Sequence, residues 1–241
     1  MGKFYEVDRK FGSEDSSYKA RKSHFSVKDP GSALTHFIAF ISAVLGTPLL
    51  LIHESALGAS NLSLISFSIF MLSMILLYGA STTYHTFDVS EHINKLLRKI
   101  DHMMIFILIA GSYTPVCLIA IGGKTGRLLL ILVWTIALAG IILKGFWITC
   151  PKWFSSVIYI GMGWVCLLAF PELLEKLPRE AFLWLLGGGI IYSIGGIIYA
   201  LKLQVFNKKF RYFGSHEIFH LFVMGGSLCH FIMMYKYLTV M

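Results

Sequence analysis

The sequence predicts an all-α polytopic membrane protein, a bundle of seven transmembrane helices. The chain is 56% hydrophobic and only 14% charged, whereas soluble domains carry about 25% charged residues. Its mean hydropathy is +0.70. A membrane-spanning helix needs roughly 20 apolar residues. Seven stretches meet this requirement: 33–53, 62–84, 102–121, 127–146, 154–171, 181–201 and 216–238.

Lysine and arginine residues between these stretches predict on which side of the membrane each connecting loop lies. With alternating spans, 16 of the 21 lysines and arginines fall on one side of the membrane. An excess of positive charge marks the cytoplasmic side, which places the N-terminus inside and the C-terminus outside. Residues 1–32 are polar and lack the apolar core of a signal peptide, so we expect a cytoplasmic tail before a single transmembrane domain of residues 33–241.

The net charge of +8 follows from this loop bias and does not predict nucleic acid as a partner. The expected partners are membrane lipids, and the sequence predicts no oligomeric state. Within the spans, Pro115 is expected to kink the third, and Pro48 has a similar place in the first. The sixth contains glycines at 187–189 and 195–196, which should let neighbouring helices approach closely.

Four polar residues lie at span ends that this topology places together on the cytoplasmic side. His85 closes the second span, Asp101 opens the third, and His216 and His220 open the seventh. Histidines four residues apart share one helix face and can bind one ion. Three imidazoles suit zinc and leave a fourth position for water, as in catalytic zinc sites. The sequence therefore predicts one Zn²⁺ ion bound by His85, His216 and His220.

Asp101 and Ser81 are the candidate catalytic residues. Asp101 can hold the water or accept its proton, and Ser81 precedes His85 by one helical turn, where it can orient the water or the carboxylate. Each residue alone has a simpler interpretation: an interfacial histidine is commonly a hydrogen-bonded anchor, and Asp101 can be a helix N-terminal charge. The joint placement favours a metal site, which other divalent first-row metals also fit.

The remaining histidines are expected to be structural. His230 lies ten residues beyond His220, about 15 Å along a helix axis, which is too far to bind the same ion. His102 is interpreted as a neighbour of Asp101 without a role of its own. The others lie in the tail, near span ends or in loops: His24, His36, His53 and His92.

Residues 216–220 also match the His-Glu-x-x-His motif of zinc proteases, in which the glutamate is the general base. A protease needs a further ligand downstream, and the following residues offer only His230 and tyrosine or lysine side chains. Protease activity is therefore the weaker interpretation, and Glu217 is expected to support the site without binding the ion.

Three separated motifs resemble the hemolysin III family, the bacterial branch of the progestin and adipoQ receptor (PAQR) superfamily. They are Ser81-x-x-x-His85, the run 98–102 leading into 109–115, and Ser215-His216-x-x-x-His220. The resemblance implies a seven-helix bundle in the bacterial plasma membrane with a cytoplasmic N-terminus. It also implies zinc near the cytoplasmic face on His85, His216 and His220, with Ser81 and Asp101 interacting with the ion or its water.

The resemblance further implies hydrolysis of a lipid amide or ester, because related members and the similar alkaline ceramidases act on lipid amides. Two alternatives stay open: a receptor-like sensor of membrane state with a structural zinc, and a cytolytic membrane protein. A pore is disfavoured because the spans carry almost no ionisable side chains away from their cytoplasmic ends. Animal receptors have glutamine at the position of Glu217, so this residue is not an obligatory base.

Overall fold

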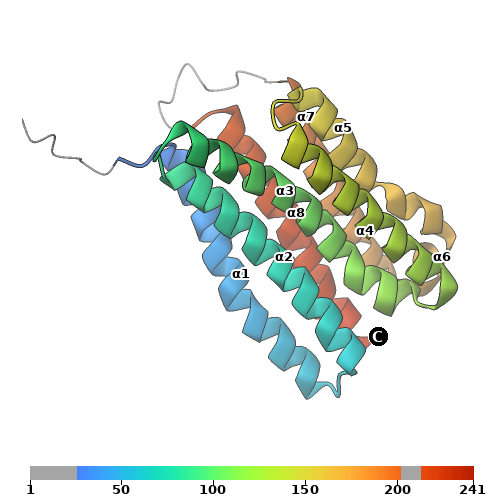
Figure 1. The fold of residues 1–241 in the computed structure, drawn as a ribbon. Helices are drawn as coiled ribbons and strands as arrows, with labels where there is room; N and C mark the ends of the chain where they lie inside the picture. The colour runs from blue at the N-terminus through green and yellow to red at the C-terminus, as the bar shows by residue number, and fades with distance from the viewer. Residues whose placement is uncertain (1–25, 202–212) are drawn as a thin grey trace, which may run out of the picture.

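The computed structural model describes residues 26–201 and 213–241, and all regular structure within them is helical. Seven helical segments are long and apolar enough to cross a membrane, which confirms the predicted fold class (Figure 1). Short helical segments of other types are η1 (Val116–Ile121), η2 (Val165–Ala169) and η3 (Leu238–Val240). The α-helices are α1 (Pro30–Ala56), α2 (Asn61–Thr86), α3 (Glu91–Pro115), α4 (Gly123–Phe146), α5 (Lys152–Gly163), α6 (Phe170–Lys176), α7 (Arg179–Leu201) and α8 (Ser215–Tyr237).

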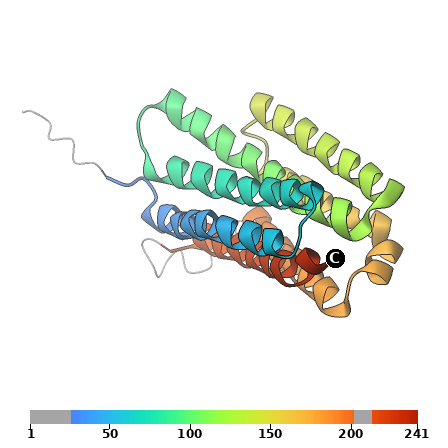
Figure 2. The ribbon, with the colours of Figure 1, turned by 90° about the horizontal axis from the view of Figure 1, so that it is seen from below.

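The helices form one bundle in which segments from both ends of the chain meet. Helices α1 to α4 pack in chain order, and α8 packs between α1 and α7, which in turn packs on α5 (Figures 1 and 2). The core between them is filled by large apolar side chains, among them Phe67, Phe70, Phe106 and Met233. This closure brings the end of α2 beside the beginning of α8.

The third helix begins eleven residues before the predicted start of its span. The Ser90 hydroxyl accepts a hydrogen bond from the amide of Ile93 (3.3 Å) and so caps the helix at this point. The charged turns that follow continue as helix beyond the apolar stretch. Asp101 therefore lies inside α3, and the expectation that it opens the helix is wrong.

Pro115 ends α3, and the π-helical turn η1 follows it directly. There the amide of Gly122 donates to the carbonyl of Cys117 at 3.0 Å, a bond that spans five residues. The fifth span holds a second irregularity, which the sequence did not predict: α5 ends at Gly163, and η2 separates it from α6.

The hydroxyl of Tyr113 forms hydrogen bonds with backbone groups at this break in the fifth span. Its hydroxyl donates to the carbonyl of Gly163 (2.6 Å) and accepts from the amide of Cys166 (2.9 Å). Unpaired backbone groups are costly in a membrane unless a side chain or water satisfies them. A side chain from α3 therefore stabilises the interruption of the fifth span.

Two glycines of the sixth span pack closely on α8, as predicted, and Gly196 packs against Ile160 of α5, while a Cβ at Gly187 or Gly189 would meet no atom within 4 Å. A Cβ at Gly188 would lie 2.6 Å from Cδ2 of His230, and one at Gly195 would lie 2.7 Å from Cβ of Phe222. Both separations are below normal van der Waals contact, so neither position has room for a side chain. Close packing at these two glycines holds α8 against α7.

Candidate metal centre

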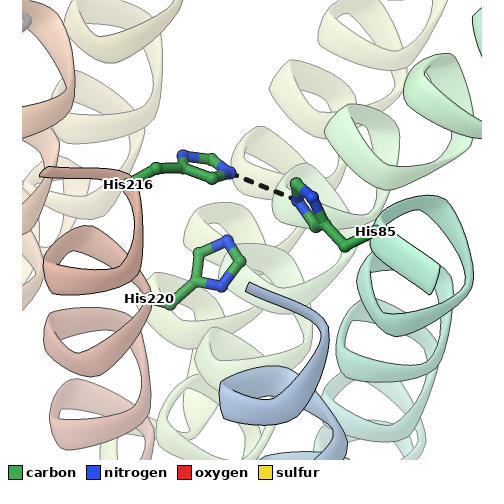
Figure 3. A group of neighbouring side chains, drawn as sticks. All are labelled: His85, His216 and His220. Carbon is green, nitrogen blue, oxygen red and sulfur yellow. Dashed lines mark hydrogen bonds between the residues drawn. The ribbon is translucent and has the colours of Figure 1, made fainter. Parts of the chain in front are cut away.

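The structure brings the three predicted ligands together at one end of the bundle. His85 comes from the last turn of α2, and His216 and His220 come from the first two turns of α8. One potential ligand atom of each lies within 4.8 Å of the others, and Nε2 of His85 is 3.2 Å from Nε2 of His216 (Figure 3). His85 and His220 are buried. The predicted histidine cluster is confirmed as an arrangement that can hold a metal ion.

The separation of the His85 and His216 ring nitrogens fits a tetrahedral zinc ion. Zinc–nitrogen bonds are about 2.0–2.1 Å long, so two imidazoles on one tetrahedral ion have their bound nitrogens roughly 3.3 Å apart. The observed separation of 3.2 Å between His85 and His216 is close to this value. The donor set of three neutral nitrogens also suits zinc, and three ligands leave one position for water or substrate.

Asp101 and Ser81 lie beside the cluster without belonging to it. Both line one cavity together with His216 and His220. The Asp101 carboxylate is buried and lies 3.4 Å from Nδ1 of His102. The Ser81 hydroxyl is buried and forms no hydrogen bond with any residue of the described ranges. Both polar groups are therefore available to a molecule that enters the cavity.

The beginning of α1 supplies contacts that the sequence analysis missed. Asp29 Oδ2 lies 2.9 Å from Nδ1 of His85, and Thr35 Oγ1 lies 3.1 Å from Nδ1 of His220. The ring of His36 stacks on that of His220, with centroids 3.5 Å apart and planes at 8°. His36, expected to be structural, is thus a buried neighbour of the centre.

The spacing of four residues in the sequence could have indicated that the beginning of α1 contacts the histidine cluster. Asp29, Ser32, Thr35 and His36 follow one another at intervals of three, three and one, which places them on one side of a helix. The interpretation of residues 1–32 as a polar tail obscured the pattern, because α1 begins at Pro30. Residues 1–25 of that tail, with His24, lie outside the described residues.

Both carboxylate oxygens of Glu217 accept hydrogen bonds at the start of α8, so this carboxylate is not positioned to act as a general base. Its Oε2 accepts from the amide of Gly214 (2.8 Å), and its Oε1 accepts from the hydroxyl of Ser32. These bonds cap α8 and tie it to α1. The zinc-protease interpretation of residues 216–220 therefore finds no support in the position of this carboxylate.

The cavity connects the histidine cluster to the interrupted fifth span. Its volume is about 170 Å³, and most of its lining is apolar. Along the fifth span it is lined by Trp164, Leu167 and Phe170, of which Leu167 is 53% exposed. His230 also lines it, packed against Gly188 and Tyr192 and outside the metal cluster.

Comparison with known proteins agrees with this architecture. The family model described as "Haemolysin-III related" matches residues 26–231. The chain is 37% identical over 211 residues to "Hemolysin-3" of Bacillus cereus, an alignment that covers 88% of this chain and 92% of the relative. It is 36% identical over 208 residues to the "Hemolysin-3 homolog" of Bacillus subtilis (strain 168), covering 86% and 93%.

A more distant relative is the "Adiponectin receptor protein" of Drosophila melanogaster. It is 24% identical over 246 residues, which cover 87% of this chain and 51% of the receptor. With its seven apolar helices, the chain is a multi-pass membrane protein, and it belongs to the haemolysin III family.

Proposed function

We propose that this protein is an intramembrane zinc hydrolase of lipid amides or esters, with the ion held by His85, His216 and His220. One observation carries the proposal: a mostly apolar cavity extends from His216 and His220 of the three-histidine cluster to Leu167 and Phe170, which are exposed on the surface that faces lipid. An acyl chain can lie in the apolar part, while its carbonyl group meets the polar end. The distribution of Lys and Arg along the sequence supports a cytoplasmic position for this end.

Zinc on three histidines supplies Lewis acidity, which activates water and polarises a carbonyl group. Residues that line the cavity would transfer the proton and stabilise the negative charge. Asp101 is placed to accept a proton from the attacking water and to return it to the leaving amine or alcohol. The Ser81 hydroxyl can donate a hydrogen bond to the oxygen that gains negative charge. His102, beside Asp101, restricts the orientation of its carboxylate.

The break in the fifth span is the proposed route for the lipid. Leu167 and Phe170 are exposed toward the lipid side and also line the cavity. A continuous apolar wall from the bilayer to the cluster lets a substrate enter sideways with its chains still in an apolar environment. A water-soluble substrate would gain nothing from this lining.

The direct test measures fatty-acid release from labelled ceramide and from a labelled acyl ester by the purified protein in lipid nanodiscs. We expect turnover that a zinc chelator abolishes and that is lost in His85→Ala and Asp101→Asn. His92→Ala is the matched control, because His92 is exposed at the beginning of α3. Equal turnover by wild type and His85→Ala would eliminate the hydrolase. Bound zinc without turnover of either substrate would favour the sensor with a structural ion.

A further inference from the structure

The first turns of α1 contact two of the three candidate ligands at the ring nitrogen that faces away from the cluster. Asp29 contacts Nδ1 of His85, and Thr35 contacts Nδ1 of His220. We propose that these contacts fix the tautomers of both histidines, so that each presents an unprotonated Nε2 to the shared site. The metal part of this inference rests on the proposed function, whereas the tautomers can be measured without any metal.

Asp29 stands at the N-cap position of α1, but its side chain does not cap the helix. An aspartate just before a helix ordinarily accepts a hydrogen bond from an amide of the first turn, but the Asp29 side chain makes no such bond. Its Oδ2 instead lies 2.9 Å from Nδ1 of His85, and its backbone amide donates to the His85 carbonyl at 2.9 Å. Residue 29 is thus attached to residue 85 at two points. A carboxylate only accepts hydrogen bonds, so Nδ1 of His85 is the donor.

Thr35 leads to the same assignment for His220. A hydroxyl group has one hydrogen to donate. The Thr35 hydroxyl is directed at the backbone carbonyls of Gly31 and Ser32, both at 3.0 Å. Toward Nδ1 of His220, at 3.1 Å, Thr35 Oγ1 is therefore the acceptor and the ring is the donor.

A neutral imidazole that carries its hydrogen on Nδ1 has its free electron pair on Nε2. In His85 this atom faces His216 at 3.2 Å. In His220 the ring nitrogen opposite the Thr35 contact points toward the other two rings (Figure 3). The parallel ring of His36 packs on His220 and restricts its rotation. Hydrogen bonds of this kind to the outer nitrogen orient metal-binding histidines and strengthen the inner nitrogen as a ligand.

The tautomers are tested by nitrogen NMR of metal-free protein labelled with ¹⁵N in histidine, in nanodiscs. We expect the hydrogen on Nδ1 of His85 and His220 in the wild type. Asp29→Ala should shift His85 toward the other tautomer and leave His220 unchanged, and Thr35→Val should do the reverse. Single His→Ala variants assign the signals. A wild type with the hydrogen on Nε2 of both rings would overturn the inference, whether or not the protein binds zinc.

Zinc affinity, measured by competition with a calibrated chelator, gives the second readout. Asp29→Ala and Thr35→Val should each weaken binding by about 10–100-fold, as is typical for such supporting partners. Asp29→Asn should lose less, because its amide oxygen still accepts a hydrogen bond. The matched controls are Asp88→Ala, in the exposed segment between α2 and α3, and Thr47→Val, whose hydroxyl donates to the carbonyl of Ala43 within α1.

The two readouts separate the possible failures. Controls that bind zinc as tightly as the wild type, beside weakened Asp29 and Thr35 variants, support the inference. Zinc binding unchanged in both Asp29→Ala and Thr35→Val would contradict it. A wild type without affinity for zinc would refute the proposed function and leave the tautomer assignment to the NMR result.

Discussion

Nε2 of His85 and Nε2 of His216 lie 3.2 Å apart, although 131 positions separate the two residues in the chain. The contact exists because α8 returns to pack against α1 and because α1 packs against the end of α2. Two ring nitrogens that face each other at this distance either share one hydrogen or bind one cation. The His220 ring beside them favours a cation, because it adds a third nitrogen donor to the same small volume.

Metal removal should lower the stability of the protein. A ligand that binds the folded state stabilises it by about 2.7 kcal/mol when its free concentration is 100 times its Kd. An ion bound by His85, His216 and His220 would hold α2 and α8 together, so we expect a chelator to lower the Tm of the wild type in detergent and zinc to restore it. His85→Ala should show a lower Tm that neither reagent moves. A wild-type Tm that is independent of the chelator would speak against a bound metal.

Tyr113→Phe should destabilise the break in the fifth span. The change removes the hydroxyl that pairs with the carbonyl of Gly163 and the amide of Cys166. An unsatisfied buried polar group costs about 1–3 kcal/mol, so chemical unfolding should show a loss in this range. Tyr237→Phe is the control, because no hydrogen bond of its hydroxyl is found among the described residues. Equal stability of the two variants would mean that the break does not depend on Tyr113.

Gly188→Ala tests the packing of α7 on α8. The added methyl group would lie 2.6 Å from His230, so either the His230 ring or the two helices must shift, at a cost of roughly 1–3 kcal/mol. Gly187→Ala is the neighbouring control, since a Cβ there meets no atom within 4 Å. Thermal unfolding should therefore distinguish two alanine substitutions one residue apart. Similar Tm values for both would refute the close contact.

The apolar stretches of the sequence predicted the seven spans because lipid imposes length and hydropathy on every crossing helix. The candidate ligands were predicted from polar residues at span ends. Alternating topology places the end of the second span and the beginning of the seventh on the same side of the membrane. His-x-x-x-His fixed the relation between His216 and His220, but the approach of His85 to them depends on tertiary packing.

Other features could not be inferred from such patterns. The early start of α3 lies in charged turns, where hydropathy gives no boundary and only the Ser90 cap marks it. The break in the fifth span depends on a tyrosine from another helix, which local sequence does not reveal. Asp29 falls within the segment expected to be a polar tail, and its contact with His85 arises only when α1 packs on α2.

The most direct measurement is elemental analysis of the purified wild type beside the His216→Ala/His220→Ala double variant, with His92→Ala as control. If the three imidazoles hold one ion, the wild type and the control will contain close to one zinc per chain, and the double variant will contain almost none. Equal metal content in wild type and double variant, or a wild type without metal after purification in zinc-containing buffer, would contradict the central claim.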